Sequence, residues 1–314
     1  MNIVFFGSSN FAVPSLKALI TKGEKISCVV TQPDRQKGRG LTLESTQIKR
    51  VSLEFGLRVY QPQKVNTPEV IEFLKDLSPD LFVVIAYGQI LGQEILDIPK
   101  IFSINVHGSL LPKYRGAAPI NWAIIKGEKT TGITIIKMVR EMDAGPIIFQ
   151  REIDISDDDT AITLEDKLSR KAQEILPDVI KNIEVKSYKL ITQDEGKASF
   201  APRLKKEDGL IPWDKSAQDI YNLIRGCFGW PGAFTYYQGK LLKIYKATVI
   251  RLSGYPVTPL PAEIIKVSKE GIVVATGKDN LIIEELQMEG KRRMKAEEFI
   301  SGHKILPKEI LGKK

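Results

Sequence analysis

The chain has 314 residues, more than one compact core usually holds, so its length predicts two domains. No apolar run reaches the roughly 18–20 residues that cross a bilayer, which argues against a membrane-spanning protein. The net charge of +8 is uneven: residues 1–200 carry a balance of +1, and residues 201–314 a balance of +7. This C-terminal surplus fits either a surface that binds phosphates or solvated lysines that keep the protein soluble.

The first half of the sequence alternates between predicted strands and predicted helices. Apolar runs bounded by turn residues predict strands at 2–7, 25–32, 57–62, 80–88, 101–108, 131–138 and 146–155. Helical spacing predicts helices at 11–23, 119–127 and 160–184, and one more that Thr67 caps and Pro68 begins. This alternation is typical of a Rossmann-like α/β domain with a doubly wound, mainly parallel sheet.

The pattern changes after about residue 190. A polar, glycine- and proline-containing stretch at 193–209 reads as a linker, and Ser216 caps a helix over 216–227. Short strands without intervening helices follow, at 233–239, 240–250, 262–271, 271–277 and 280–287. They predict a small OB-like β-barrel. The expected domains are 1–190, a linker at 191–208, and the barrel at 209–314.

The two cysteines and the start of the chain indicate an intracellular protein. Cys28 and Cys227 lie far apart in the sequence, and we expect both to be free thiols. The first strand begins almost at Met1 with no basic stretch before it, so no secretory or transit peptide is expected.

Asn105 and His107 stand at the end of one predicted strand, in the stretch "INVHGSLLP". Side chains two apart in a strand point to the same face, and ligands of open parallel sheets bind at the strands' carboxyl ends. Both side chains can donate hydrogen bonds to an oxygen that becomes negative when a carbonyl is attacked. Packing or turn roles are the alternative for both residues. The spacing therefore indicates a site without naming its reaction.

Asp143 follows the next predicted strand, in "REMDAGPI". A carboxylate on the same rim of the sheet can set the protonation state of His107. The alternative is a simple Asx turn before Ala144 and Gly145.

Known metal and nucleotide motifs are missing from the sequence. Neither HxxxH nor CxxC occurs, and His303 lies in a separate C-terminal segment, so no metal is expected. The stretches "GSSNFAVP" and "GRG" match neither GxGxxG nor a P-loop, which disfavours a nucleotide-binding oxidoreductase.

Taken together, these motifs resemble those of the 10-formyltetrahydrofolate-dependent formyltransferases, and within them the methionyl-tRNA formyltransferases. The matching blocks cover nearly the whole chain: "VFFGSSNFAVPSL", "TQPDRQKGRG", "VVIAYGQIL", "NVHGSLLPKYRGAAPI", "MDAGPI", "APRLKKEDGLIPW" and "IRGCFGWPGAFT". The "NVHGSLLP" block is specific to the formyl-transfer fold. The "TQPDRxxGRG" loop and the C-terminal block separate the tRNA enzymes from their relatives.

The resemblance implies a catalytic role for Asn105, His107 and Asp143, with 10-formyltetrahydrofolate as co-substrate. It also implies a folate pocket, formed by Ser109, Leu110, Leu111 and Pro112 and completed by backbone at Ala86, Tyr87 and Gly88. One departure is visible: this chain has Glu141 where the family usually has glycine, two positions before the aspartate.

The acceptor implied by the resemblance is initiator methionyl-tRNA, formylated on its α-amine for translation initiation. We expect the "TQPDRQKGRG" loop to become ordered on tRNA, although a solvated surface loop is the alternative. The candidate tRNA contacts are basic residues, namely Arg35, Lys37, Arg39, Arg203, Lys205 and Lys206, with Lys240, Lys243, Lys246, Lys291, Arg292 and Arg293 in the C-terminal domain. We expect a cytoplasmic monomer with no membrane partner.

Three other functions compete with this one. A glycinamide ribonucleotide formyltransferase would lack the C-terminal domain, and a nucleotide-sugar formyltransferase would lack "TQPDRQKGRG". An RNA-binding module that has lost catalysis would not need Asn105, His107 and Asp143.

Overall fold

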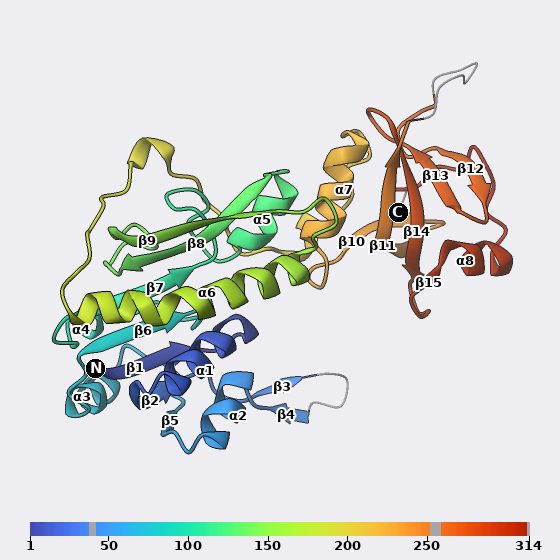
Figure 1. The fold of residues 1–314 in the computed structure, drawn as a ribbon. Coiled ribbons are helices and arrows are strands. Elements are labelled where there is room, and N and C mark those ends of the chain that lie inside the picture. Colours follow the sequence, from blue (N-terminus) through green and yellow to red (C-terminus); the bar gives the residue numbers. More distant parts are fainter. Residues whose placement is uncertain (38–41, 252–258, 313–314) are drawn as a thin grey trace. The chain divides into compact units, whose positions relative to one another are not determined.

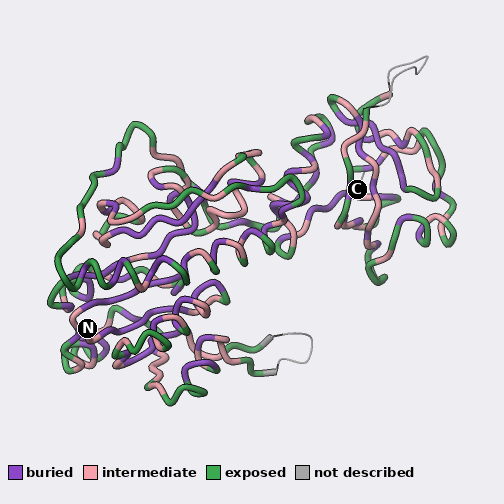
Figure 2. The backbone as a smooth tube through the Cα atoms, in the orientation of Figure 1, coloured by how far each residue is buried: buried purple, intermediate pink, exposed green. Residues whose placement is uncertain are grey.

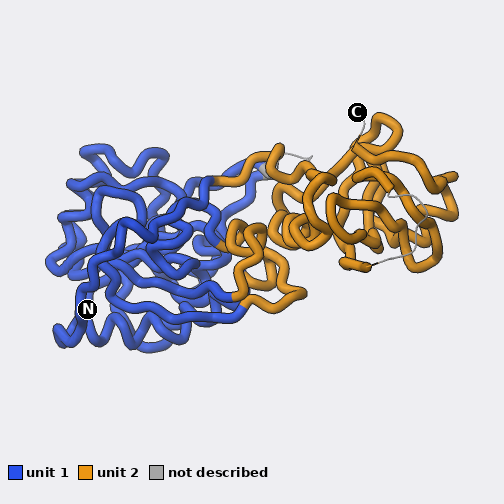
Figure 3. Tube along the Cα trace, turned by 90° about the horizontal axis from the view of Figure 1, so that it is seen from above, with its two compact units in different colours: residues 1–119, 130–154, 165–202 blue, residues 120–129, 155–164, 203–314 orange. Residues whose placement is uncertain are grey.

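The computed structural model describes residues 1–37, 42–251 and 259–312. The chain forms two compact units (Figure 3). Unit 1 consists of residues 1–119, 130–154 and 165–202, and unit 2 consists of residues 120–129, 155–164 and 203–314. Within the described ranges, no helix is both long enough and apolar enough to cross a bilayer.

Unit 1 is built on a seven-stranded sheet with the order β5-β2-β1-β6-β7-β8-β9 (Figure 1). Neighbouring strands from β5 to β7 pair in parallel, whereas β8 is antiparallel to β7, and β9 to β8. The strands are β1 (Asn2–Gly7), β2 (Lys25–Val30), β5 (Val59–Tyr60), β6 (Leu81–Ile85), β7 (Phe102–His107), β8 (Thr130–Lys137) and β9 (Ile147–Asp154). This arrangement confirms the predicted Rossmann-like, mainly parallel sheet.

Helices α1 (Val13–Thr21), α2 (Gln47–Glu54), α3 (Pro68–Asp76), α4 (Gln93–Leu96) and most of α6 (Ala161–Glu184) belong to unit 1. One apolar core joins alternate residues of the central strands, such as Phe6 and Val84, to α3 and α4. Figure 2 shows β1 and β6 buried along nearly their whole length. Because parallel strands of this kind are covered on both faces, they read in the sequence as continuous apolar runs.

Two local predictions for unit 1 need correction. Thr67 and Pro68 begin α3 as predicted, but the Thr67 side chain makes no capping hydrogen bond. The segment "TQPDRQKGRG", predicted to be a loop, contains strand β3 (Arg35–Lys37), which pairs with β4 (Thr42–Glu44). The two strands form because this pairing satisfies backbone N–H and C=O groups that a loop leaves to water.

Unit 2 contains a six-stranded antiparallel sheet with the order β10-β11-β14-β13-β12, in which β15 pairs with β14. Its strands are β10 (Ala233–Tyr237), β11 (Lys240–Ile250), β12 (Ile264–Ser268), β13 (Gly271–Ala275), β14 (Asn280–Met288) and β15 (Met294–Lys295). Its helices are α5 (Pro119–Ile125), α7 (Ala217–Gly226) and α8 (Ala296–Gly302). Of α5, Ile120 and the residues after it belong to unit 2. The predicted change to a C-terminal domain of short β-strands is confirmed, and the structure shows that these strands pair antiparallel.

Helix α7 contacts two segments of unit 2 that come from earlier in the sequence, residues 120–129 and 155–164. Ser216 caps this helix as predicted, accepting from the backbone N–H of Asp219. The buried Arg225 donates to the Asp159 carbonyl at 2.7 Å, and Asn121 Nδ2 donates to the Gly226 carbonyl at 2.8 Å. Residues 120–129 and 155–164 therefore pack with the C-terminal part of the chain, while the sequence-based bounds of 1–190, 191–208 and 209–314 stay a prediction.

Both cysteines are buried free thiols, which confirms the prediction that no disulfide joins them. Burial raises the pKa of the Cys28 thiol to about 11 and that of the Cys227 thiol to about 12. Neither thiol therefore has the exposed, acidic character of a nucleophilic cysteine.

Candidate active site

Asn105 and His107 lie on one face of β7, at the carboxyl end of a parallel strand. Val84 of β6 is paired with Asn105, so the loop that follows β6 begins at the level of His107. On the other side of β7, Thr134 of β8 is paired with His107. The His107 side chain is only 6% exposed, so a group that reaches it is largely removed from water.

Asp143 lies in the loop between β8 and β9, and its carboxylate faces both residues. Its Oδ1 accepts a hydrogen bond from Asn105 Nδ2 at 3.1 Å, and its Oδ2 lies 3.6 Å from His107 Nδ1. The backbone N–H of Gly116 also donates to Oδ2, at 2.9 Å. The structure thus brings the three predicted catalytic residues together and adds a backbone donor that the sequence did not reveal.

The second ring nitrogen of His107 is also occupied by the protein. Nε2 lies 2.9 Å from the carbonyl oxygen of Tyr114, and a carbonyl can only accept, so Nε2 carries a proton. Tyr114 holds this carbonyl from a left-handed backbone conformation, with φ of 62°. Nδ1, on the other side of the ring, faces the Asp143 carboxylate.

The Glu141 departure leaves the loop intact. The left-handed backbone of this loop falls on Asp143, with φ of 54°, and not on Glu141. Aspartate tolerates that conformation better than most residues. Glycine is required instead at Gly145, where an added Cβ would lie 1.8 Å from the Lys137 carbonyl oxygen.

The predicted folate loop is tightly fixed to β8. The Thr134 hydroxyl donates to the Ser109 carbonyl at 2.6 Å and accepts from the Leu111 N–H at 3.1 Å. Gln150 Nε2 donates to the Leu111 carbonyl at 2.9 Å. The Leu111–Pro112 peptide bond is cis, and the Leu110 side chain lies against Gly132 of β8. Residues 109–112 therefore present a loop of defined shape beside His107.

The other part of the predicted pocket follows β6. Ala86 and Gly88 have positive φ angles of 46° and 90°. The Tyr87 side chain between them is 2% exposed and packs against the Phe6 ring, and burial raises its pKa. The Tyr87 side chain is thus part of the core, and the backbone role expected for this segment stays a prediction.

Three functional candidates were missed by the sequence reasoning. Thr134 fixes the predicted folate loop. Gln193 Nε2 donates to the Asp143 carbonyl at 2.7 Å, and Arg115 donates to Gln193 Oε1. Gln193 is 50 residues from Asp143 in the sequence and falls in a stretch read as a linker. No local pattern could have identified it.

The predicted tRNA contacts divide by location. Arg35 is exposed in β3, the side chain of Lys37 and all of Arg39 lie outside the described residues, and Arg203, Lys205 and Lys206 are exposed in unit 2. In the C-terminal part of unit 2, three of the candidate cations are paired with acidic side chains, namely Lys246 with Glu284, Arg292 with Glu298 and Arg293 with Glu285. Their charges are therefore partly balanced by the protein itself.

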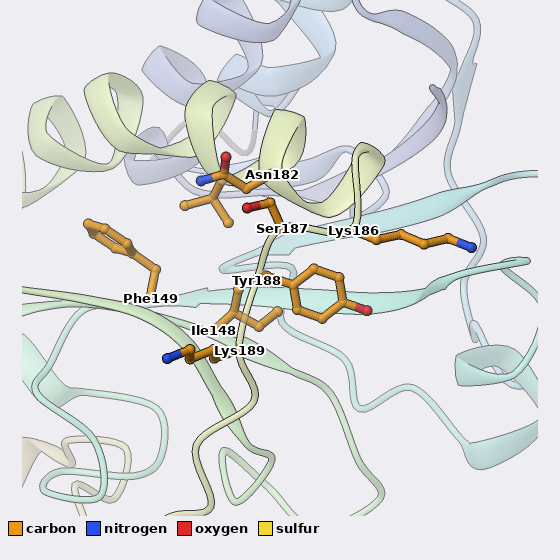
Figure 4. A pocket seen from close by; sticks show the side chains of 8 residues that line it. Ile148, Phe149, Asn182, Lys186, Ser187, Tyr188 and Lys189 are labelled. Carbon is orange, nitrogen blue, oxygen red and sulfur yellow. The ribbon is translucent and has the colours of Figure 1, made fainter.

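Unit 1 contains a cavity of about 350 Å³, and none of the predicted site residues lines it. This cavity lies beside the end of α6 and β9 (Figure 4) and is lined by Ile148, Phe149, Val179, Asn182, Lys186, Ser187, Tyr188 and Lys189. Over the described part of the chain, no cluster of three or more His, Cys, Asp or Glu side chains could hold a metal ion.

Comparison with known proteins identifies both parts of the chain. Residues 1–180 match the family model "Formyl transferase", and residues 203–304 match "Formyl transferase, C-terminal domain". The methionyl-tRNA formyltransferase of Acetivibrio thermocellus is 47% identical over 99% of this chain and 100% of that protein. The enzyme of the same name from Thermodesulfovibrio yellowstonii is 48% identical over 96% of each chain.

Solved structures support the same fold at lower identity. WlaRD, a sugar 3N-formyl transferase, superposes with a TM-score of 0.67 at 21% identity, over 93% of this chain and 99% of that one. A methionyl-tRNA formyltransferase from Clostridium thermocellum gives a TM-score of 0.55 at 22% identity, over 80% and 94%. With near-complete coverage of relatives more than 45% identical, the chain belongs to the methionyl-tRNA formyltransferase family.

Proposed function

We propose that Asn105, His107 and Asp143 catalyse the reaction for which the family is named. The formyl group of 10-formyltetrahydrofolate passes to the α-amine of initiator methionyl-tRNA, giving N-formylmethionyl-tRNA for translation initiation. The observation that carries this assignment is the Asp143 carboxylate, which contacts Asn105 through one oxygen and faces His107 and Gly116 N–H with the other.

In the reaction, the amine nitrogen attacks the formyl carbon and the bond from that carbon to N10 of the folate breaks. Asn105 uses one Nδ2 hydrogen for Asp143, so the second can donate to the formyl oxygen as it becomes negative. A donor of this kind, held in place before reaction, lowers the barrier by roughly 3 kcal/mol.

His107 moves the proton that the amine loses to the departing N10. Because Nε2 already carries a proton, it leaves the Tyr114 carbonyl, donates that proton to N10 and then takes up the proton that the amine loses, while the Asp143 carboxylate faces Nδ1. The burial of His107 strengthens both effects, since water does not compete for these hydrogen bonds.

A folate co-substrate is supported by the loop of residues 109–112 and the backbone of 86–88. A pterin ring presents an edge of donors and acceptors that backbone N–H and C=O groups can pair with. The fold also occurs in WlaRD, whose structure was determined in the presence of 5-N-formyl-THF.

For the tRNA, we infer that the exposed cations Arg35, Arg203, Lys205 and Lys206, together with Lys37 and Arg39, contact phosphates. The C-terminal cations Lys240, Lys243 and Lys291 are further candidate phosphate contacts in unit 2, and the enzyme acts as a cytoplasmic monomer. Phosphate contacts position an RNA without reading its sequence, so these residues supply affinity and orientation.

The decisive assay offers the purified enzyme three acceptors with 10-formyltetrahydrofolate: methionyl-tRNA, glycinamide ribonucleotide and an amino-sugar nucleotide. Formylation of methionyl-tRNA alone is the expected result, with uncharged tRNA as the control. Faster transfer to either small acceptor would contradict the proposal.

A further inference from the structure

Gln193 binds the backbone on both sides of the Asp143 turn. Its Nε2 donates to the carbonyls of Asp143 and Gly145, each at 2.7 Å, and the side chain is buried, with 6% exposed. Asp143 is in the left-handed conformation, and Gly145 is pressed against the Lys137 carbonyl. The amide therefore joins the ends of a turn whose backbone has little other freedom.

The orientation of this amide is fixed by Arg115. Gln193 Oε1 accepts from Arg115 Nε at 3.1 Å and from Arg115 Nη2 at 2.8 Å. Guanidinium groups can only donate, so the oxygen must face Arg115 and the two amide hydrogens must face the carbonyls. All donors and both acceptor positions of the Gln193 amide are thereby used.

Arg115 is held in turn by the Glu195 side chain and by the backbone of Ser199 and Ala201. The two guanidinium NH groups donate to the two Glu195 oxygens at 2.9 and 2.7 Å. The Arg115 side chain is 5% exposed and that of Glu195 is 71% exposed, so a buried cation is balanced by a carboxylate at the surface. Arg115 N–H also donates to the Ser199 carbonyl, and its own carbonyl accepts from Ala201 N–H.

We propose that Gln193 is a positioning residue that sets the Asp143 carboxylate against Asn105 and His107, and that Arg115 and Glu195 orient its amide. Gly116, next to Arg115, donates to the Asp143 carboxylate, while Gln193 holds the Asp143 backbone. Both the carboxylate and the backbone carbonyl of Asp143 are thus held by neighbouring residues of one hydrogen-bonded group, Gly116, Arg115 and Gln193. This proposal rests on the proposed function, because it assigns how that site keeps its geometry.

The diagnostic substitution is Gln193→Glu. The introduced carboxylate still accepts from Arg115, but it has no hydrogen to donate to the two carbonyls and repels their oxygens, so the link to the Asp143 turn is lost. A displaced catalytic group lowers turnover more than binding, so kcat should fall about 10-fold or more while KM for both substrates changes by less than about 3-fold. The matched control is Asn66→Asp, the same chemical change in an amide of unit 1 that also joins two backbone groups, those of Ile90 and Gly92. Its kcat should be unchanged.

A double-mutant cycle separates positioning from general loosening. If Gln193 acts through Asp143, Gln193→Glu should lower kcat by less than about 3-fold in an Asp143→Asn background. Equal losses in both backgrounds, or near-normal kcat for the folded single variant, would overturn the role of Gln193. The wild-type rate distinguishes the two proposals: an inactive wild type contradicts the proposed function, whereas an active wild type matched by Gln193→Glu contradicts only the positioning role.

Glu195→Gln provides a second route if the Gln193 variant does not fold. The substituted side chain is mostly exposed, so it leaves no buried void, but it removes the charge that balances Arg115. We expect a smaller fall in kcat, roughly 3- to 10-fold, at unchanged KM for methionyl-tRNA. A kcat equal to that of the wild type, with an unchanged melting temperature, would overturn the role assigned to the Arg115–Glu195 pair.

Discussion

Gly116 and Asp143 are 27 positions apart in the sequence, yet the Gly116 backbone N–H donates to Asp143 Oδ2 at 2.9 Å. This bond ties the chain beyond the predicted folate loop to the turn that carries the predicted catalytic carboxylate. Gly116 has φ of 121°, and an added Cβ would lie 2.7 Å from the Ala201 carbonyl oxygen. The position therefore requires glycine for two separate reasons.

Gly116→Ala should lower both stability and turnover, because the backbone must shift away from Ala201 and withdraw its N–H from Asp143. Gly23→Ala is the matched control: Gly23 also has a positive φ, of 79°, but an added Cβ meets nothing within 4 Å. The control should lose only about 1 kcal/mol of unfolding free energy, with normal kcat. Denaturant unfolding and formylation kinetics of the two variants test the difference, and equal kcat values would refute it.

Asn105→Ala and His107→Ala should each lower formyl transfer about 100-fold or more, because each removes a donor or proton carrier at the reacting group. Folate affinity should change far less. His303→Ala is the control, since it removes the only other histidine, which lies in unit 2. Single-turnover formylation and fluorescence-monitored folate binding measure the two effects. Near-normal turnover in either site variant would sink the mechanism.

Thr134→Val should raise KM for 10-formyltetrahydrofolate and cost about 1–3 kcal/mol of unfolding free energy, because it leaves the Ser109 carbonyl and the Leu111 N–H without their partner. Thr131→Val, in the same strand, is the control. The Thr131 hydroxyl is buried and makes no hydrogen bond, so its removal should be neutral or stabilising. Equal effects of the two substitutions on KM would show that Thr134 does not support the folate loop.

Replacing Arg203, Lys205 and Lys206 by alanine should weaken tRNA binding and make it less sensitive to salt. The slope of log affinity against log salt concentration should fall by about 0.7–0.9 for each phosphate that these side chains no longer neutralise. Lys246→Ala should change the slope less, because Lys246 Nζ is already paired with Glu284 at 2.7 Å. Binding of tRNA across a salt series measures both. These substitutions are preferable to truncation near Lys205, which would strip residues 120–129 and 155–164 of their packing partners in unit 2.

Cys28 should make stability fall at alkaline pH. Its pKa is raised by burial to about 11, above the ordinary value of 9.0, so the thiol contribution is fully present below pH 9. Between about pH 9 and 11 the thiol ionises only in the unfolded chain, and the unfolding free energy drops by roughly 2–3 kcal/mol. Urea unfolding of wild type and Cys28→Ala over this range isolates the effect. Parallel pH curves for the two proteins would contradict it.

The sequence by itself determined most strands of the two sheets, the longer helices and the candidate chemistry of one strand end. Continuous apolar runs predicted β1, β2, β6 and β7, because strands covered on both faces carry no polar alternation. The two-residue spacing of Asn105 and His107 placed both side chains on one face of β7, which depends only on local backbone geometry.

Tertiary structure decided what these residues contact. The bonds from Asn105 and Gly116 to Asp143 join positions 38 and 27 residues apart, and Gln193 reaches the same turn from 50 residues away. Nothing in the local pattern around Gln193 records those partners, because they are created by the packing of one loop on another. The "TQPDRQKGRG" segment shows the same limit: its composition is that of a loop, yet pairing with β4 makes part of it a strand. Local periodicity therefore predicted the framework, whereas long-range hydrogen bonds determined the geometry of the site.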